Sequence, residues 1–170
     1  MATPSHRAHK EQAPAAVICG IVTVSDTRTP ETDKSGALIR EQLISHGHEA
    51  RAYHIVKDEP KEIRRLLELL LARADLQALI INGGTGIAQR DVTFDVVTRL
   101  LQKELPGFGE FFRHFSYEEI GSAALMSRAT AGIANNKVVF SVPGSSGAVE
   151  LAMKRLILPE LSHLVYELNK

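Results

Sequence analysis

The chain has 170 residues, the size of one ordinary domain with its own hydrophobic core. Lys and Arg together number 20, as do Asp and Glu, so no net charge draws the protein to nucleic acid or to an anionic membrane. The single cysteine, Cys19, excludes an internal disulfide, and its apolar surroundings favour a buried thiol over a nucleophile.

The lengths and positions of the apolar segments also exclude some classes of protein. The apolar runs are too short to span a membrane, and residues 1–14 lack the apolar segment of a secretory signal. Residues 1–14 therefore predict a disordered tail, followed by a single domain over residues 15–170. By elimination, we expect a cytoplasmic protein.

The first half of the chain alternates strand and helix patterns. Apolar runs predict buried strands over residues 15–25 and 76–82, and a further strand is predicted over residues 49–56. Helical spacing follows each run: over residues 34–46, from Ile63 to Ala74, and from Val92 to Leu101. This order predicts parallel strands joined by right-handed crossovers.

The second half is less regular. Residues 105–115 hold four of the six phenylalanines, which favours either a satellite core or a subunit interface. Asn135-Asn136 predicts a β-hairpin between strands 129–134 and 137–142, which adds an antiparallel strand. A helix through Leu156 should break at Leu158-Pro159, where Pro159 begins another. The predicted fold class is α/β, a three-layer α/β/α arrangement with a mostly parallel sheet and an antiparallel hairpin strand.

Three predicted strands run into polar or glycine-rich loops, which lie on one rim if the strands are parallel. The loops are Ser25-Asp26, Gly83-Gly84-Thr85-Gly86 and Pro143-Gly144-Ser145-Ser146-Gly147. Glycine lets backbone N–H groups approach phosphate oxygens, so the implied ligand is phosphorylated. Neither the P-loop nor the dinucleotide fingerprint matches, and the first glycine loop taken alone is more often a structural turn. The second loop on the same rim reverses that preference.

Two carboxylates accompany these loops. Asp58 and Asp91 offer the hard oxygen ligands that Mg²⁺ takes when it bridges to substrate phosphates. Asp91 is also a candidate helix cap, as are Thr93 and Asp95. Arg90 would add positive charge, although an exposed arginine at a helix start is the commoner case. The histidines indicate no metal site, and no Ser-His-Asp order supports acyl transfer.

Several motifs occur in order between residues 15 and 168. They are Thr23-Val24-Ser25-Asp26, Ile80-Ile81-Asn82-Gly83-Gly84-Thr85-Gly86 with Arg90-Asp91-Val92-Thr93, Leu105-Pro106-Gly107-Phe108-Gly109-Glu110, Ser127-Arg128 and Val142-Pro143-Gly144-Ser145. Together they resemble the molybdenum-cofactor biosynthesis proteins of the MoaB/MogA family, and residues 116–121 are most similar to the MoaB branch. That family often has Thr-Pro-Asp where this chain has Thr93-Phe94-Asp95, a difference that should reduce order at the turn without removing a catalytic group.

The resemblance implies a reaction and a set of site residues. Active family members use Mg²⁺ and ATP to adenylylate the phosphate of molybdopterin, and pyrophosphate leaves. By position, Asp58 and Asp91 match the carboxylates associated with Mg²⁺ and turnover. The implied binding residues are Ser25, Asp26, Gly83, Gly84, Thr85, Gly86, Thr93, Gly144 and Ser145, and Arg90 joins the two carboxylates as a candidate catalytic group.

The hypothesis from the sequence is therefore a molybdopterin adenylyltransferase. The alternative is a non-catalytic molybdopterin-binding oligomer of the same fold, and a scaffold domain is a third possibility. The resemblance further implies self-association to a trimer or hexamer, and contacts with other proteins of the molybdenum-cofactor pathway.

Overall fold

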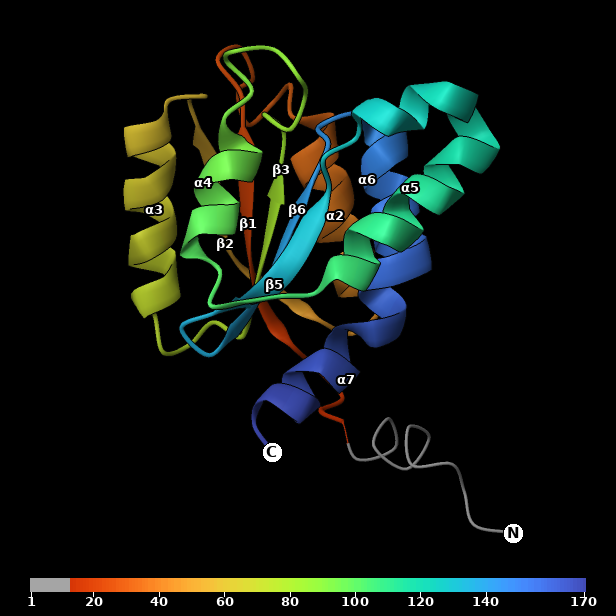
Figure 1. Ribbon diagram of the computed structural model, residues 1–170. Helices are drawn as coiled ribbons and strands as arrows, with labels where there is room; N and C mark the ends of the chain where they lie inside the picture. Colours follow the sequence, from red (N-terminus) through yellow and green to blue (C-terminus); the bar gives the residue numbers. More distant parts are fainter. Residues whose placement is uncertain (1–12) are drawn as a thin grey trace, which may run out of the picture.

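A six-stranded sheet lies between two layers of helices in the computed structural model, which describes residues 13–170 (Figure 1). The strand order is β2-β1-β3-β6-β5-β4. Strands β1, β2, β3 and β6 are parallel, whereas β5 is antiparallel to β6 and β4 is antiparallel to β5. The predicted three-layer α/β fold is confirmed. The predicted tail, residues 1–14, lies almost wholly outside the described residues.

The elements follow one another with short connections. The strands are β1 (Ile18–Val24), β2 (Glu49–Val56), β3 (Ala78–Asn82), β4 (Lys103–Glu104), β5 (Thr130–Ala134) and β6 (Lys137–Val142). The helices are α2 (Lys34–Ser45), α3 (Pro60–Ala72), α4 (Thr93–Leu100), α5 (Pro106–Ile120), the 3₁₀ segment η1 (Gly121–Met126), α6 (Ser146–Ala152), the π-helical segment η2 (Met153–Ile157) and α7 (Leu158–Leu168). Within residues 13–170, no helix is both long enough and apolar enough to cross a membrane.

Alternate side chains of the central strands enter two separate cores, because successive residues of a strand point to opposite faces. In β3, Ile80 packs under α2, α5, α6 and α7, whereas Ile81 packs under α3 and α4. In β1, Cys19 lies in the first core and is completely buried, as predicted. Figure 1 shows α3 and α4 together on one face of the sheet. Both faces of β1 and β3 are therefore apolar because each face packs against a layer of helices.

The β5–β6 hairpin was predicted from its turn, and the structure confirms it. Asn135 and Asn136 have φ values of 46° and 57°, the left-handed angles that a two-residue hairpin turn requires. Ala134 pairs with Lys137 across the turn. The hairpin reverses the chain so that β6 runs parallel to β3 at the centre of the sheet.

Two parts of the second half differ from expectation. Residues 105–115, expected as a satellite core or a subunit interface, lie mostly in the helix α5, which buries Phe112 in the first core and leaves Phe111 57 % exposed. The predicted new helix with Pro159 in its first turn is present as α7, but no break separates it from α6, because the helical backbone continues through η2. Proline has no N–H and its ring crowds the carbonyl one turn earlier. The wider turn of η2 immediately before Pro159 gives that carbonyl room.

Candidate functional site

The carboxyl ends of β1, β3 and β6 meet at one edge of the sheet and surround an open polar pocket of about 420 Å³. Parallel strands bring the loops that follow them to the same edge, so the predicted common rim is present. The pocket is lined by Val24, Ser25, Thr27, Arg28, Gly83, Gly84, Thr85, Gly86, Asp91, Met126, Ser127, Pro143 and Gly144.

The glycine loop has the shape that only glycine supplies easily. Gly83 has φ of 101° and Gly84 has φ of 60°, in the left-handed region. A Cβ at Gly83 would collide with the carbonyl oxygen of Val24, and a Cβ at Gly84 would collide with the Thr93 hydroxyl. The Gly83 N–H donates to the carbonyl of Val142 at 3.1 Å, which joins the ends of β3 and β6. The loop is therefore held close against both neighbouring strand ends.

Asp58 lies behind this loop. Its Oδ2 is 2.9 Å from the position that a Cβ on Gly84 would take, and its Oδ1 is buried with no hydrogen-bond partner. Burial raises the pKa of Asp58, and the nearby charges of Asp91 and Asp26 raise it further, against a backbone hydrogen bond from Val92. An unpartnered carboxylate oxygen among other carboxylates is a fitting environment for a cation.

Asp91 closes the far end of the loop. Its Oδ2 accepts from the Ala88 N–H at 3.0 Å, and its carboxyl group lies 2.5 Å from the position that a Cβ on Gly86 would take. Asp91 does not cap α4: the residue at the cap position is Val92, and no side chain there bonds the helix. The prediction of a cap is wrong because the carboxylate folds back into its own turn.

Asp58 and Asp91 therefore flank the glycine loop from two sides. Across residues 13–170, no three His, Cys, Asp or Glu side chains form a ready metal cluster. The arrangement fits an ion such as Mg²⁺, which keeps several waters and is held by one or two carboxylates together with substrate phosphates.

Arg90 and Asp26 form an ion pair outside the pocket. Arg90 Nη2 lies 2.6 Å from Asp26 Oδ2, and the arginine side chain is 71 % exposed. Asp26 Oδ1 also accepts from the N–H of Asp58 at 3.2 Å. Both residues thus lie on the predicted rim, but neither lines the pocket.

Thr93 and Ser145 sit at helix starts on the rim. The Thr93 N–H donates to the carbonyl of Gly84 at 3.0 Å, and its buried hydroxyl has no hydrogen-bond partner. The Ser145 hydroxyl accepts from the N–H of Ala148 at 3.3 Å and caps α6. Ser25 plays a similar local part, since its hydroxyl accepts from the N–H of Arg28 at 3.1 Å.

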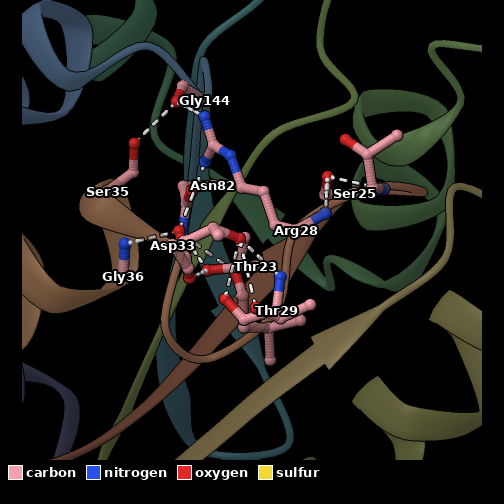
Figure 2. Close-up of polar contacts among 12 residues, drawn as sticks. Thr23, Ser25, Arg28, Thr29, Asp33, Ser35, Gly36, Asn82 and Gly144 are labelled. Atoms are coloured by element: carbon pink, nitrogen blue, oxygen red, sulfur yellow. Dashed lines mark hydrogen bonds and ion pairs between the residues drawn. The ribbon is translucent and has the colours of Figure 1, made fainter.

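Arg28, which the sequence did not single out, is the cation of the pocket lining. Its Nη2 donates to the carbonyl of Gly144 at 2.9 Å, and its Nη1 lies 3.3 Å from Asp33 Oδ1 (Figure 2). Ser35 donates to the same Gly144 carbonyl at 2.7 Å. Arg28 therefore ties the loop after β1 to the loop after β6 and places a positive charge between them.

The partner of Arg28 is a buried carboxylate. Asp33 accepts from the hydroxyls of Thr23 at 2.5 Å and Tyr53 at 2.7 Å and from the N–H of Gly36 at 3.0 Å. Burial alone would raise the pKa of Asp33, but these hydrogen bonds and the charge of Arg28 together lower it. Three neutral donors also hydrogen-bond to the ionised carboxylate of Asp33. Asp33 therefore does not occupy all the N–H donors of Arg28.

Arg128 is a second arginine whose role the sequence did not reveal. It follows η1, and its guanidinium donates to the carbonyls of Thr85, Gly86 and Asp91. Partners of this kind have no short-range sequence signal, because more than thirty residues separate them: the sequence separation from Arg128 to Asp91 is 37. The motif Ser127-Arg128 was the only indication.

The fold and the site together define a class: an open α/β protein with a polar ligand pocket outside the carboxyl ends of its parallel strands. Residues 20–163 match the family described as "Probable molybdopterin binding domain". The chain belongs to that family, and the resemblance inferred from the motifs is confirmed.

Relatives and solved structures agree with this assignment. The chain is 56 % identical over 163 residues to molybdenum cofactor biosynthesis protein B of Bacillus subtilis, which covers 95 % of this chain and 96 % of the relative. A crystal structure of a molybdenum cofactor biosynthesis protein B matches with a TM-score of 0.90 and 55 % identity, over 93 % of this chain and 99 % of the other. The tungsten cofactor synthesizing protein MoaB from Pyrococcus furiosus matches with a TM-score of 0.81 and 40 % identity, over 93 % and 100 %.

Proposed function

We propose that this protein acts in molybdenum cofactor biosynthesis as a molybdopterin adenylyltransferase, which transfers AMP from ATP to the phosphate of molybdopterin and releases pyrophosphate. One observation carries the proposal: the glycine loop and Asp91 line one open polar pocket, and the unpartnered oxygen of Asp58 lies directly behind Gly84 of that loop. Family membership supplies the pterin, and the names of the relatives supply the pathway.

The reaction requires positioning and charge neutralisation rather than a covalent protein group. An oxygen of the pterin phosphate forms a bond to the α-phosphorus of ATP, and the bond from that phosphorus to the oxygen shared with the β-phosphate breaks. Pyrophosphate leaves with that oxygen and its electron pair. The N–H groups of Gly84, Thr85 and Gly86 and the guanidinium of Arg28 bind phosphate oxygens as the charge redistributes.

Asp58 and Asp91 are the residues that would hold Mg²⁺, which when bound neutralises phosphate charge. Asp58 is suited to this because one of its oxygens is buried without a partner, and Asp91 because it projects beside the loop. Arg90 contributes at longer range: it neutralises Asp26, whose negative charge raises the pKa of Asp58. We propose a cytoplasmic location, where ATP is available.

The test is pyrophosphate release from MgATP that depends on added molybdopterin. We expect Asp91→Ala and Asp58→Ala to lower the rate by about 100-fold or more, the scale of losing a transition-state charge contact. Asp75→Asn is the matched control, because Asp75 forms exposed ion pairs with Arg51 and Arg73 away from the rim. Its rate should stay within about twofold of the unmodified protein.

Absence of molybdopterin-dependent release at saturating substrates would contradict the proposal. If molybdopterin still bound, with no effect of ATP and with normal binding by Asp91→Ala, the non-catalytic pterin-binding oligomer would be the better description. Binding and release are therefore measured on the same samples, and thermal unfolding checks that each variant is folded.

We further propose that a second copy of the chain covers part of α5 and η1. Phe111, Leu125 and Met126 are 57 %, 83 % and 52 % exposed, and Met126 also lines the pocket. A contact between copies would bury apolar area that a monomer leaves in water, next to the site.

Light scattering should show a trimer or hexamer, and Leu125→Glu should shift the assembly toward monomer. A monomer at micromolar concentration would remove this proposal. Contacts with other proteins of the pathway are a further expectation.

A further inference from the structure

Arg128 hydrogen-bonds to the backbone of the loop that carries Asp91. Nε donates to the carbonyl of Gly86 at 2.9 Å and to that of Thr85 at 3.2 Å. Nη2 donates to the carbonyl of Asp91 at 2.6 Å. One planar group therefore bonds the loop at both of its ends.

The other contact between this loop and a neighbouring loop is weak: Arg90 pairs with Asp26 at 2.6 Å, but the arginine side chain is 71 % exposed, so the ion pair contributes little. Ala88 and Asp91 bond one another, with the Asp91 N–H on the Ala88 carbonyl at 3.0 Å and the Ala88 N–H on the Asp91 carboxylate at 3.0 Å. These bonds shape the turn but do not attach it to the sheet. Ile87 is 72 % exposed, so packing at the tip contributes little. Arg128, by contrast, directly precedes the core residue Ala129, which lies immediately before β5.

Two contacts from α4 orient the guanidinium. Nη1 lies 3.1 Å from Asp95 Oδ2, and the guanidinium carbon lies 5.0 Å from the centre of the Phe94 ring. A flat cation on an aromatic ring and a carboxylate on its edge restrict the rotation of the group. The side chain is only 29 % exposed, so it is held on several sides.

We propose that Arg128 is a positioning residue that sets the location of the Asp91 carboxylate and, through it, the affinity of the site for a divalent cation. The inference rests on the proposed function for the role of Asp91, and it adds the residue that places it. A lysine cannot substitute, because its ammonium is a point charge that cannot bond three carbonyls in one plane while stacking on Phe94.

The experiment compares Arg128→Lys with a matched control, Arg155→Lys. Arg155 also stacks on a phenylalanine, with its guanidinium carbon 4.1 Å from the centre of the Phe115 ring, but it lies in η2 and does not line the pocket. The readouts are kcat, the KM for molybdopterin, the half-saturating Mg²⁺ concentration, and the affinity of Mn²⁺ in the presence of ATP by proton relaxation.

For Arg128→Lys we expect kcat to fall and the half-saturating Mg²⁺ concentration to rise, each by about 10- to 100-fold, the usual cost of losing a group that orients a metal ligand. The KM for molybdopterin should change by less than about threefold, because the substitution leaves the residues that line the pocket unchanged. A general loss of structure would instead change kcat, the KM and the half-saturating Mg²⁺ concentration together. Arg155→Lys should match the unmodified protein. Phe94→Leu, which keeps an apolar side chain and removes the ring, should act in the same direction by about two- to fivefold.

The Mn²⁺ measurement separates this inference from the proposed function. If the unmodified protein releases no pyrophosphate but Mn²⁺ binds about tenfold more weakly to Arg128→Lys, the adenylyltransferase proposal fails and the positioning role stands. If Mn²⁺ affinity is the same in both proteins, or neither binds the ion, the positioning role is overturned. Equal losses in Arg155→Lys would overturn it too.

Discussion

At the scale of single residues, the rim depends on a carboxylate that does not face the ligand. The side chain of Asp33 is completely buried, and it bonds Thr23, Tyr53 and Gly36 as well as Arg28. A buried ion pair is costly unless its remaining lone pairs are satisfied, and here they are. Arg28 is therefore held in one position between two loops, whereas an arginine with a flexible, exposed side chain would not be.

Asp33→Asn should expose this dependence through pH. The pKa of Asp33 is lowered in the folded protein, so the unfolded chain binds more protons around pH 4 and the free energy of unfolding rises with pH there. The stabilisation is present above the unfolded pKa of about 3.9 and is lost as pH falls through the folded pKa. At pH 7 we expect Asp33→Asn to cost roughly 1.5–3 kcal/mol, with the difference shrinking below about pH 4. Urea unfolding between pH 3 and 7 measures this, and a difference independent of pH would contradict it.

Gly84→Ala tests the close approach of the glycine loop to Asp58. The new Cβ would collide with the Thr93 hydroxyl, would lie 2.9 Å from the Asp58 carboxylate, and would hold a left-handed backbone angle. We expect a loss of about 1–2 kcal/mol in the free energy of unfolding, together with loss of pyrophosphate release. Gly107→Ala is the control: nothing lies within 4 Å of its added Cβ, and it should gain about 0.5–1 kcal/mol in α5. Full activity in Gly84→Ala would show that the loop tolerates displacement.

The sequence predicted the loops of the site but not the groups that hold them. Ser25, the glycine loop and Gly144 were found because glycine and polar residues directly follow strand patterns. Arg28 was missed, and Arg90 was preferred, because Arg90 is adjacent to the glycine loop in sequence. The bond from Arg28 to Gly144 spans 116 residues, so only the sheet order brings the two together.

At the scale of elements, local patterns located the strands of the first half of the chain. The strand predicted over residues 49–56 coincides with β2, and the apolar runs at β1 and β3 were found because both of their faces are covered. The helix α5 was not predicted, because Gly107 and Gly109 lower helix propensity in its first turn. Its burial of Phe112 against the core overrides that propensity, which no local pattern reports.

The β5–β6 hairpin gives a prediction at this scale. Both turn asparagines have positive φ, so a β-branched residue there is strained whereas glycine is not. Asn136→Val should lower the free energy of unfolding by about 1–2 kcal/mol. Asn136→Gly should stay within about 0.5 kcal/mol, because it relieves the backbone but loses the bond to Asn169 at 3.1 Å. Urea unfolding distinguishes the two, and equal effects would show that the side chain rather than the backbone angle matters.

At the scale of the whole molecule, the pocket joins distant parts of the chain. Its lining comes from the loops after β1, β3 and β6 and from the end of η1, residues 24 to 144. A ligand that contacts all of these loops at once binds only the folded state, because the unfolded chain does not bring the loops together. Binding free energy is then added to the stability of the complete fold.

MgATP should therefore raise the midpoint of thermal unfolding. At a ligand concentration 100 times the dissociation constant, the added stability is about 2.7 kcal/mol, which in a domain of this size corresponds to roughly 5–11 °C. Arg28→Gln should reduce the shift, because it removes the cation of the pocket lining, whereas Asp75→Asn should show the full shift. Differential scanning calorimetry with and without MgATP gives the comparison. An equal shift in Arg28→Gln would mean that the nucleotide binds without this arginine, and no shift in the unmodified protein would mean that ATP does not occupy the pocket by itself.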